Sequence, residues 1–346
     1  MAKISEAELK AQIKSGELSN VYMIYGEESY LKEFYVNKLK SVAVNSAFAD
    51  FNYHYFDGKD ASIDEILRDA QMFPMMSEYN CVLVHDYPLD KSSSDVDALK
   101  EFFTDVPDTT VLIFWFDSID VDFKKSAKWK SIETAFAKAG SAVNLEKRTE
   151  ADLTKLVVAR AKKHNCSFDL QLAKYFISVV GTDINTVFNE LDKICAKVSQ
   201  GEITKTHVDT LATKCLQARV FDLSKFIIKG DSDNAFDILN TLFYQKEDPI
   251  AILSVISSCY VDLYRVKCAK LANEDEQSLA QYFNYKGKEF LIRNASRDCR
   301  NMSVSQLRRA IDALAETDEL LKSSSIDKQI LLEETVAKLI NEVHNA

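Results

Sequence analysis

The chain of 346 residues exceeds the usual size of one domain, about 100–200 residues, and its formal net charge is −10. This acidic balance argues against a protein that coats nucleic acid over its whole surface, because phosphate contacts need lysine and arginine. Apolar residues make up 47% of the chain and only 8 Gly and 4 Pro are present, which excludes a disordered chain and favours long helices.

The cysteines and the apolar runs indicate a cellular compartment. Seven cysteines are scattered without any C-x-x-C pair, a usage typical of a reducing cytosol. Residues 1–12 are polar and charged, and we expect no apolar run near the ~18 residues of a membrane span. The sequence therefore predicts a soluble cytoplasmic protein with no membrane partner.

The first part of the chain alternates short apolar runs with amphipathic helical patterns. Strands are predicted at Val21–Tyr25, Phe51–Phe56, Cys81–His85, Thr110–Phe116 and Ala142–Leu145. Helices are predicted at Leu31–Val44, Ile63–Gln71, Ser94–Phe103 and Lys124–Ala139. This alternation predicts βαβ units, and therefore an α/β domain with a mainly parallel sheet over residues 1–145.

After Arg148 the strand patterns stop, and apolar residues follow at three- and four-residue spacing. Helices at Ala151–Lys163, Leu170–Val180, Ile184–Val198 and Lys205–Ala212 predict a small all-α domain over residues 146–215. Seven more helices are predicted at Val220–Lys229, Ser232–Gln245, Pro249–Lys270, Gln277–Tyr282, Glu289–Asn301, Ser303–Lys322 and Ile326–His344. These define a third, all-α domain over residues 216–346, with helix starts at Asp231 and Pro249.

A glycine turn between the first strand and the first amphipathic helix resembles a damaged phosphate-binding loop. On the pattern G-x-x-x-x-G-K-[ST], Gly26 is the first glycine and Lys32 the lysine. Leu31 replaces the second glycine, and Glu33 replaces the hydroxyl residue that holds magnesium. Two glutamates also follow Gly26 where phosphates would lie, which opposes anion binding. The loop is therefore predicted to bind no nucleotide cofactor.

A cluster of apolar residues lies at the end of the helix predicted at Ile63–Gln71. It comprises Met72, Phe73, Pro74, Met75 and Met76. Flexible methionines beside a phenylalanine suit an adaptable pocket on a partner, but an apolar helix end is more commonly buried in the core. From the residues alone both interpretations stay open.

Two aspartates, Asp86 and Asp117, end apolar strands as a magnesium-binding residue would, but neither is followed by a second acidic residue. We interpret both as caps and predict no catalytic residue. The lysines from Lys124 to Lys130 are interpreted as a solvated helix face. No histidine or cysteine spacing supports a metal site.

A local basic excess near the third domain indicates an interface with DNA or with a neighbouring subunit. The basic residues are Lys286, Lys288, Arg293, Arg297, Arg300, Arg308 and Arg309, against two acidic residues in the same stretch.

Several stretches, in this order, resemble one family, the delta subunit of the bacterial DNA polymerase III clamp loader. They are Val21–Leu31, Gly181–Asp183, Asn189–Ile194, Val220–Leu223 with Gly230-Asp231, Asp248–Ile250 and Glu316–Lys322. The resemblance implies an AAA+-like first domain with a degenerate phosphate loop, a small helical lid and a helical collar that joins a heteropentamer.

The same resemblance implies partners and a mechanism. The partners would be the ring-shaped sliding clamp (beta), other subunits of the gamma/tau and delta prime type, and primed DNA; ATP would be handled by neighbouring subunits. The residues Met72–Met76 lie where the family carries a hydrophobic wedge for the clamp, although the family often shows a Leu-Phe or Phe-Phe pair there. Two alternatives stay open: an active P-loop ATPase, and a generic helical adaptor.

Overall fold

The computed structural model describes residues 3–285 and 289–344. The chain divides into two compact units, Met1–Thr149 and Glu150–Ala346. The first unit is α/β and the second is almost entirely helical, in agreement with the predicted fold class. The further division of the second unit into a lid and a collar, at residue 215, stays a prediction.

The first unit is built on a five-stranded parallel sheet with the order β2-β3-β4-β1-β5. The strands are β1 (Val21–Tyr25), β2 (Tyr53–Asp57), β3 (Asn80–His85), β4 (Thr110–Trp115) and β5 (Ser141–Asn144). Strand β1 pairs with both β4 and β5, so it lies inside the sheet, where all five of its residues are buried. A continuous apolar run is what a strand covered on both faces requires.

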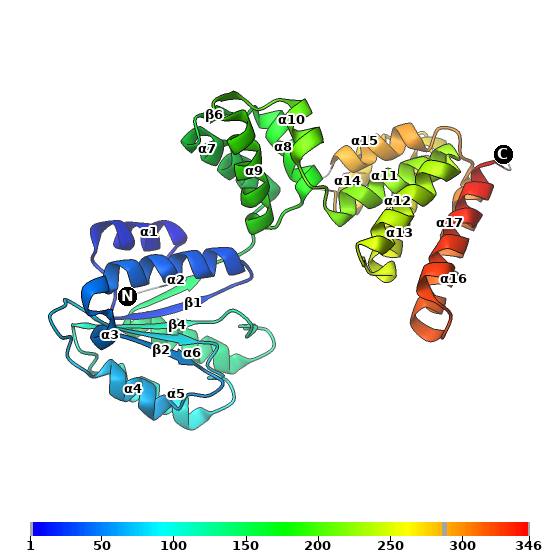
Figure 1. Cartoon of the computed structure of the whole chain (residues 1–346). Helices are drawn as coiled ribbons and strands as arrows, with labels where there is room; N and C mark the ends of the chain where they lie inside the picture. The colour runs from blue at the N-terminus through cyan, green and yellow to red at the C-terminus, as the bar shows by residue number, and fades with distance from the viewer. Residues whose placement is uncertain (1–2, 286–288, 345–346) are drawn as a thin grey trace. The chain divides into compact units, whose positions relative to one another are not determined.

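Helices cover both faces of this sheet (Figure 1). Helices α1 (Glu6–Ser15) and α2 (Ser29–Ala43) lie on one face, and α4 (Ile63–Ala70), α5 (Ser93–Phe102) and α6 (Ala127–Ala139) lie on the other. Alternate residues of β1 point to the two helical layers on opposite faces of the sheet. Met23 packs in the core below α4–α6, whereas the Tyr22 hydroxyl donates to Gln12 of α1 at 2.9 Å.

Several predicted boundaries in this unit are wrong. Phe51 was assigned to a strand but belongs to the short helix α3 (Ala49–Asn52), which follows a 3-10 turn, η1 (Ser46–Phe48). Helix α6 begins only at Ala127, so the first lysines of the Lys124–Lys130 run precede it. The aromatic in that run, Trp129, is buried in the core rather than on a solvated face.

No element is predicted from the sequence before Val21, but residues Glu6–Ser15 form helix α1. Its start carries a capping box in which the Ser5 side chain accepts from the Glu8 N–H and the Glu8 carboxylate accepts from the Ser5 N–H. It ends at Gly16, whose φ of 80° is left-handed. Both signals were present in the sequence.

The second unit begins with α7 (Glu150–Lys163), α8 (Leu170–Val180), α9 (Ile184–Val198) and α10 (Lys205–Leu211). The prediction that strands stop after Arg148 is wrong in one detail, because β6 (Cys166–Ser167) and β7 (Gly201–Glu202) form a short parallel pair. The turn before α9 was predicted correctly. Asp183 caps that helix by accepting from the Thr186 N–H.

The remaining elements of this unit form one helical core. They are α11 (Leu216–Lys229), α12 (Ser232–Tyr244), α13 (Pro249–Leu271), η2 (Glu276–Ser278), α14 (Leu279–Tyr282), α15 (Glu289–Asp298), α16 (Val304–Ser323) and α17 (Lys328–His344). The predicted starts at Asp231 and Pro249 are confirmed, since Asp231 caps α12 and Pro249 is the first residue of α13.

From the sequence we expect no apolar run near the length of a membrane span, and helix α13 shows that this prediction is wrong by length and composition. Within the described residues it is the one helix long and apolar enough to cross a membrane by length and composition. Its buried residues, such as Ile256, Tyr260 and Leu263, belong to the common core of this helical unit. Its packing partners are α11, α15 and α16, so its apolar character serves that core.

Candidate functional site

The turn between β1 and α2 is compact and closed from one side by the chain after β5. The Leu145 N–H donates to the Tyr25 carbonyl at 2.8 Å, and the Leu145 carbonyl accepts from the Glu28 N–H at 3.0 Å. Gly26 has a φ of 123°, and a Cβ there would lie 2.3 Å from the Leu145 carbonyl oxygen. Glycine is therefore required at position 26 by backbone packing against its neighbour, independently of any phosphate.

Lys32 does not face a ligand site but is bound within the fold. Its side chain is 2% exposed, and its Nζ donates to the Phe116 carbonyl at 2.9 Å and lies 3.1 Å from Asp117 Oδ1. Leu31, at the second glycine position, is buried, and Glu33 is exposed. The lysine thus ties α2 to the end of β4, which makes the turn a structural joint.

Asp86 caps the segment that follows β4, as predicted. It is buried, and its carboxylate accepts from the backbone N–H groups of Asp117 at 2.7 Å and of Ser118 at 3.0 Å. Burial raises the pKa of Asp86, but these hydrogen bonds more than offset the burial, so the pKa lies below its ordinary value. The carboxylate is a structural acceptor.

The apolar cluster after α4 faces solvent. Phe73 is 84% exposed and Met76 is 80% exposed, while Met72 and Met75 are 44% and 56% exposed. The alternative in which these side chains fill the core is therefore excluded for all four; Pro74 is half-buried. We call residues Met72–Met76 the apolar loop. Such exposure of neighbouring large apolar side chains marks an interaction surface.

Two buried asparagines hold the backbone of the apolar loop. The Asn52 side chain accepts from the Met75 N–H at 2.6 Å and donates to the Met75 carbonyl at 2.9 Å and to the Phe48 carbonyl at 3.0 Å. Asn80 donates to the Met72 carbonyl at 3.2 Å. Both asparagines are at most 1% exposed, so the loop backbone is held from the buried side while the large apolar side chains of the loop face solvent.

Sequence reasoning missed Asn52, Asn80 and Phe51. Phe51 is 59% exposed and precedes Asn52 in α3, the helix that holds the apolar loop. Phe51 continues the apolar–polar alternation of the strand that follows it, so the local pattern gave no signal that it lies in a helix. The bonds of the asparagines join residues far apart in sequence, so no local pattern indicates them.

The basic segment is partly neutralised by its own chain. Arg309 pairs with Glu342 at 2.8 Å, Arg297 pairs with Asp298 at 2.8 Å, and Arg308 donates to the Tyr264 hydroxyl at 3.1 Å. Arg293 and Arg300 are exposed on and just after α15, and neither makes an ion pair with another described residue. The segment also includes Lys286 and Lys288, which lie outside the described residues.

No metal centre is formed within the described residues. Over 3–285 and 289–344, no group of three or more His, Cys, Asp or Glu side chains is placed to hold a metal ion. The seven cysteines are all free thiols, and Cys195 is buried in the core of its helical unit.

Two family models match the chain. The model of the DNA polymerase III delta subunit matches residues 22–139, and the model of its C-terminal domain matches residues 217–339. The chain belongs to the DNA polymerase III delta subunit family. The resemblance drawn from the sequence is confirmed, and the first match includes both the β1–α2 turn and the apolar loop.

Relatives with known names match this chain over nearly its full length. The DNA polymerase III subunit delta of Bacillus subtilis (strain 168) is 26% identical over 336 residues, covering 95% of each chain. The probable delta subunit of Aquifex aeolicus (strain VF5) is 21% identical, covering 90% of this chain and 92% of its own. A solved structure, the Bacillus subtilis DNA clamp loader delta protein, is 25% identical with a TM-score of 0.56, covering 97% and 99% of the two chains.

Proposed function

We propose that this delta-family chain is a non-catalytic clamp-loader subunit that binds the DNA sliding clamp through the apolar loop and opens the clamp ring. The observation that carries the proposal is the exposure of four large apolar side chains on a loop fixed by buried hydrogen bonds. The family, and the similarity to a solved structure of a DNA clamp loader delta protein, support the role.

The free energy for ring opening would come from burial of the loop side chains in a pocket of the clamp. Fully burying one such side chain stabilises a complex by about 1.5–3 kcal/mol relative to leaving it exposed. A ligand shifts a conformational equilibrium only by its difference in affinity for the two states. Phe73 and Met76 open the ring if their pocket fits better when the ring interface is distorted.

The β1–α2 joint supports a subunit that leaves ATP to its neighbours. A phosphate at this turn would compete with the bonds that hold Lys32 to Asp117 and to the Phe116 carbonyl. The competing hypothesis is an active P-loop ATPase. Equilibrium titration with labelled ATP decides between them: binding that is lost in Lys32→Ala would favour the ATPase, and our proposal expects no binding in either protein.

Purified clamp provides the direct test of the loop assignment. Met75→Asp combined with Met76→Asp should abolish binding of the clamp in the absence of nucleotide, because two carboxylates would have to be desolvated in an apolar pocket. Leu170→Asp combined with Ile330→Asp is the matched control, since Leu170 and Ile330 are 48% and 59% exposed in the helical unit. Unchanged affinity in the double variant, with an unchanged melting temperature, would refute the loop assignment.

We further propose that the helical unit joins subunits of the gamma/tau and delta prime type in a heteropentamer in the cytoplasm. Arg293 and Arg300 then contact a neighbouring subunit or primed DNA in the assembled complex. The alternative, a generic helical adaptor, predicts that immobilised clamp captures no protein. Capture by the clamp would therefore exclude the adaptor.

A further inference from the structure

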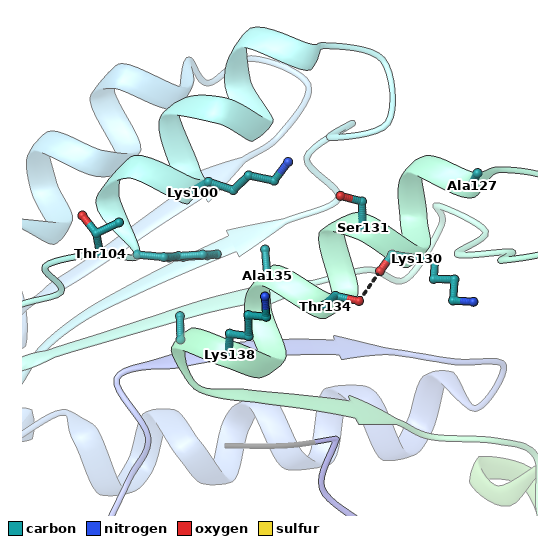
Figure 2. A pocket seen from close by; sticks show the side chains of 10 residues that line it. Lys100, Thr104, Ala127, Lys130, Ser131, Thr134, Ala135 and Lys138 are labelled. Carbon is teal, nitrogen blue, oxygen red and sulfur yellow. Dashed lines mark hydrogen bonds between the residues drawn. The ribbon is translucent and has the colours of Figure 1, made fainter.

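A pocket of about 610 Å³ lies between α5 and α6 on the first unit (Figure 2). Three lysines line it, Lys100 from α5 and Lys130 and Lys138 from α6, together with the hydroxyls of threonine and serine side chains. Figure 2 shows Lys100 and Ser131 extending toward one another across the space between the helices. No carboxylate is among the described lining residues, although the whole chain is acidic.

The charges of these lysines are largely uncompensated. The nearest carboxylate to Lys100 is that of Asp97, at 3.8 Å, with both side chains well exposed. Such an exposed, solvent-screened pair compensates little of the charge. Lys130 and Lys138 make no ion pair with any other residue that the structure describes. The pocket therefore presents a positive potential that the surrounding fold does not neutralise.

The N-terminal end of α6 adds to this potential at the Ala127 side of the pocket, whereas Lys138 and Ala139 line the pocket at the opposite, C-terminal end of the helix. Ala127, the first residue of the helix, lines the pocket, and the helix has no acidic residue in its first turn. The N-cap Ser126 makes no side-chain hydrogen bond to the helix. Lys130 near the positive end of the helix dipole opposes helix stability. A bound anion would offset that repulsion and satisfy free N–H groups.

The floor of the pocket is apolar. The Phe103 ring packs edge-on against Phe136, with centroids 4.9 Å apart, and its half-buried face lines the pocket beside Ala135 and Ala139. Nucleic acid would need exposed aromatic planes or a long basic stripe. Here Phe103 is half-buried and lines the pocket together with Ala135 and Ala139, which suits an aliphatic or aromatic side chain with carboxylates on either side.

We propose that this pocket binds an acidic peptide segment of a partner protein. One apolar side chain of the peptide lies on Phe103, and flanking carboxylates pair with Lys100 and Lys138. The proposal does not rest on the clamp-binding role of the apolar loop, which uses different residues. Binding should weaken with salt, because the contacts are made by exposed charges.

Fluorescence anisotropy with the full chain and a labelled six-residue peptide of alternating glutamate and leucine tests the pocket. Lys100→Gln with Lys138→Gln should weaken binding at least about tenfold, which corresponds to about 1.4 kcal/mol. The control is Lys14→Gln with Lys59→Gln, which makes the same change in charge at exposed lysines of the same unit that lie outside the pocket. The control should bind as the parent does.

Ala135→Leu provides a second test, because it fills the pocket without a change in charge and should also weaken binding. Thermal unfolding of each variant shows that the fold is kept. Absence of peptide binding to the parent chain overturns the proposal, as does an equal loss in the control pair. Displacement of the peptide by an oligothymidine at lower concentration than by unlabelled peptide would assign the pocket to nucleic acid instead.

Discussion

Asn52 should control clamp affinity without touching the clamp. Asn52→Ala removes hydrogen bonds of 2.6 and 2.9 Å to Met75 and one of 3.0 Å to Phe48. Each contributes about 0.5–1.5 kcal/mol net, so the free energy of unfolding should fall by about 1.5–4.5 kcal/mol if no water replaces the side chain. The apolar loop then loses its fixed backbone.

The cost to binding follows from the entropy of the freed loop. Fixing the backbone of one residue costs about 1–2 kcal/mol, so re-ordering two residues on the clamp costs about 2–4 kcal/mol. A loss of about 2 kcal/mol corresponds to roughly 30-fold weaker binding. Surface plasmon resonance with immobilised clamp would measure this change in Kd, and thermal unfolding would measure stability.

Asn20→Ala is the matched control for this prediction. The Asn20 amide bonds to the carbonyls of Pro107, Asp108 and Thr110 at 3.2, 2.9 and 3.0 Å, in the same unit but not in the apolar loop. The control should lose stability and keep its clamp affinity. Wild-type affinity in Asn52→Ala, or equal losses in both variants, would refute the positioning argument.

Two further predictions concern stability alone. Lys32→Met should lower the free energy of unfolding by about 2–4 kcal/mol, because the Asp117 carboxylate and the Phe116 carbonyl lose the buried ammonium group that they bind. An unchanged midpoint of urea unfolding would contradict this prediction. Partial burial raises the pKa of the Glu6 carboxyl group, but hydrogen bonds from Tyr35 and Arg148 outweigh this effect and lower the pKa from 4.5 to about 2. Because the pKa is lower in the folded state, the ionised Glu6 carboxylate stabilises the fold fully above the unfolded pKa of about 4.5, and this stabilisation is lost as the pH falls to about 2. The difference in melting temperature between the parent chain and Glu6→Gln should therefore shrink over this pH range.

The α/β character of the first unit could be predicted because local patterns suffice for it. The strand Val21–Tyr25 was predicted at its exact bounds, since a five-residue apolar run ends at a glycine whose conformation no other residue adopts easily. Helices α8 and α9 were also exact, because amphipathic periodicity and the Asp183 cap mark their ends. Phe51 and the start of α6 were wrong, because short helices and boundary residues carry little periodicity.

Some features of the candidate site could likewise be predicted from the sequence, and others could not. The sequence by itself determined that the phosphate loop is degenerate, because Leu31 and Glu33 stand where glycine and a hydroxyl residue are needed. Only the tertiary structure decided what became of Lys32, since its partners Phe116 and Asp117 directly follow β4, more than eighty positions away in the chain. Long-range contacts of this kind leave no trace in local spacing.

The exposure of the apolar loop was likewise decided by tertiary structure. The composition of Met72–Met76 fits a buried helix end and a partner surface equally well, because apolar side chains serve both. What separates the two is the pair of buried asparagines: Asn52 and Asn80 bind the loop backbone, so the backbone is anchored while the side chains remain in solvent. The sequence determined which side chains are present; the fold determined which way they face.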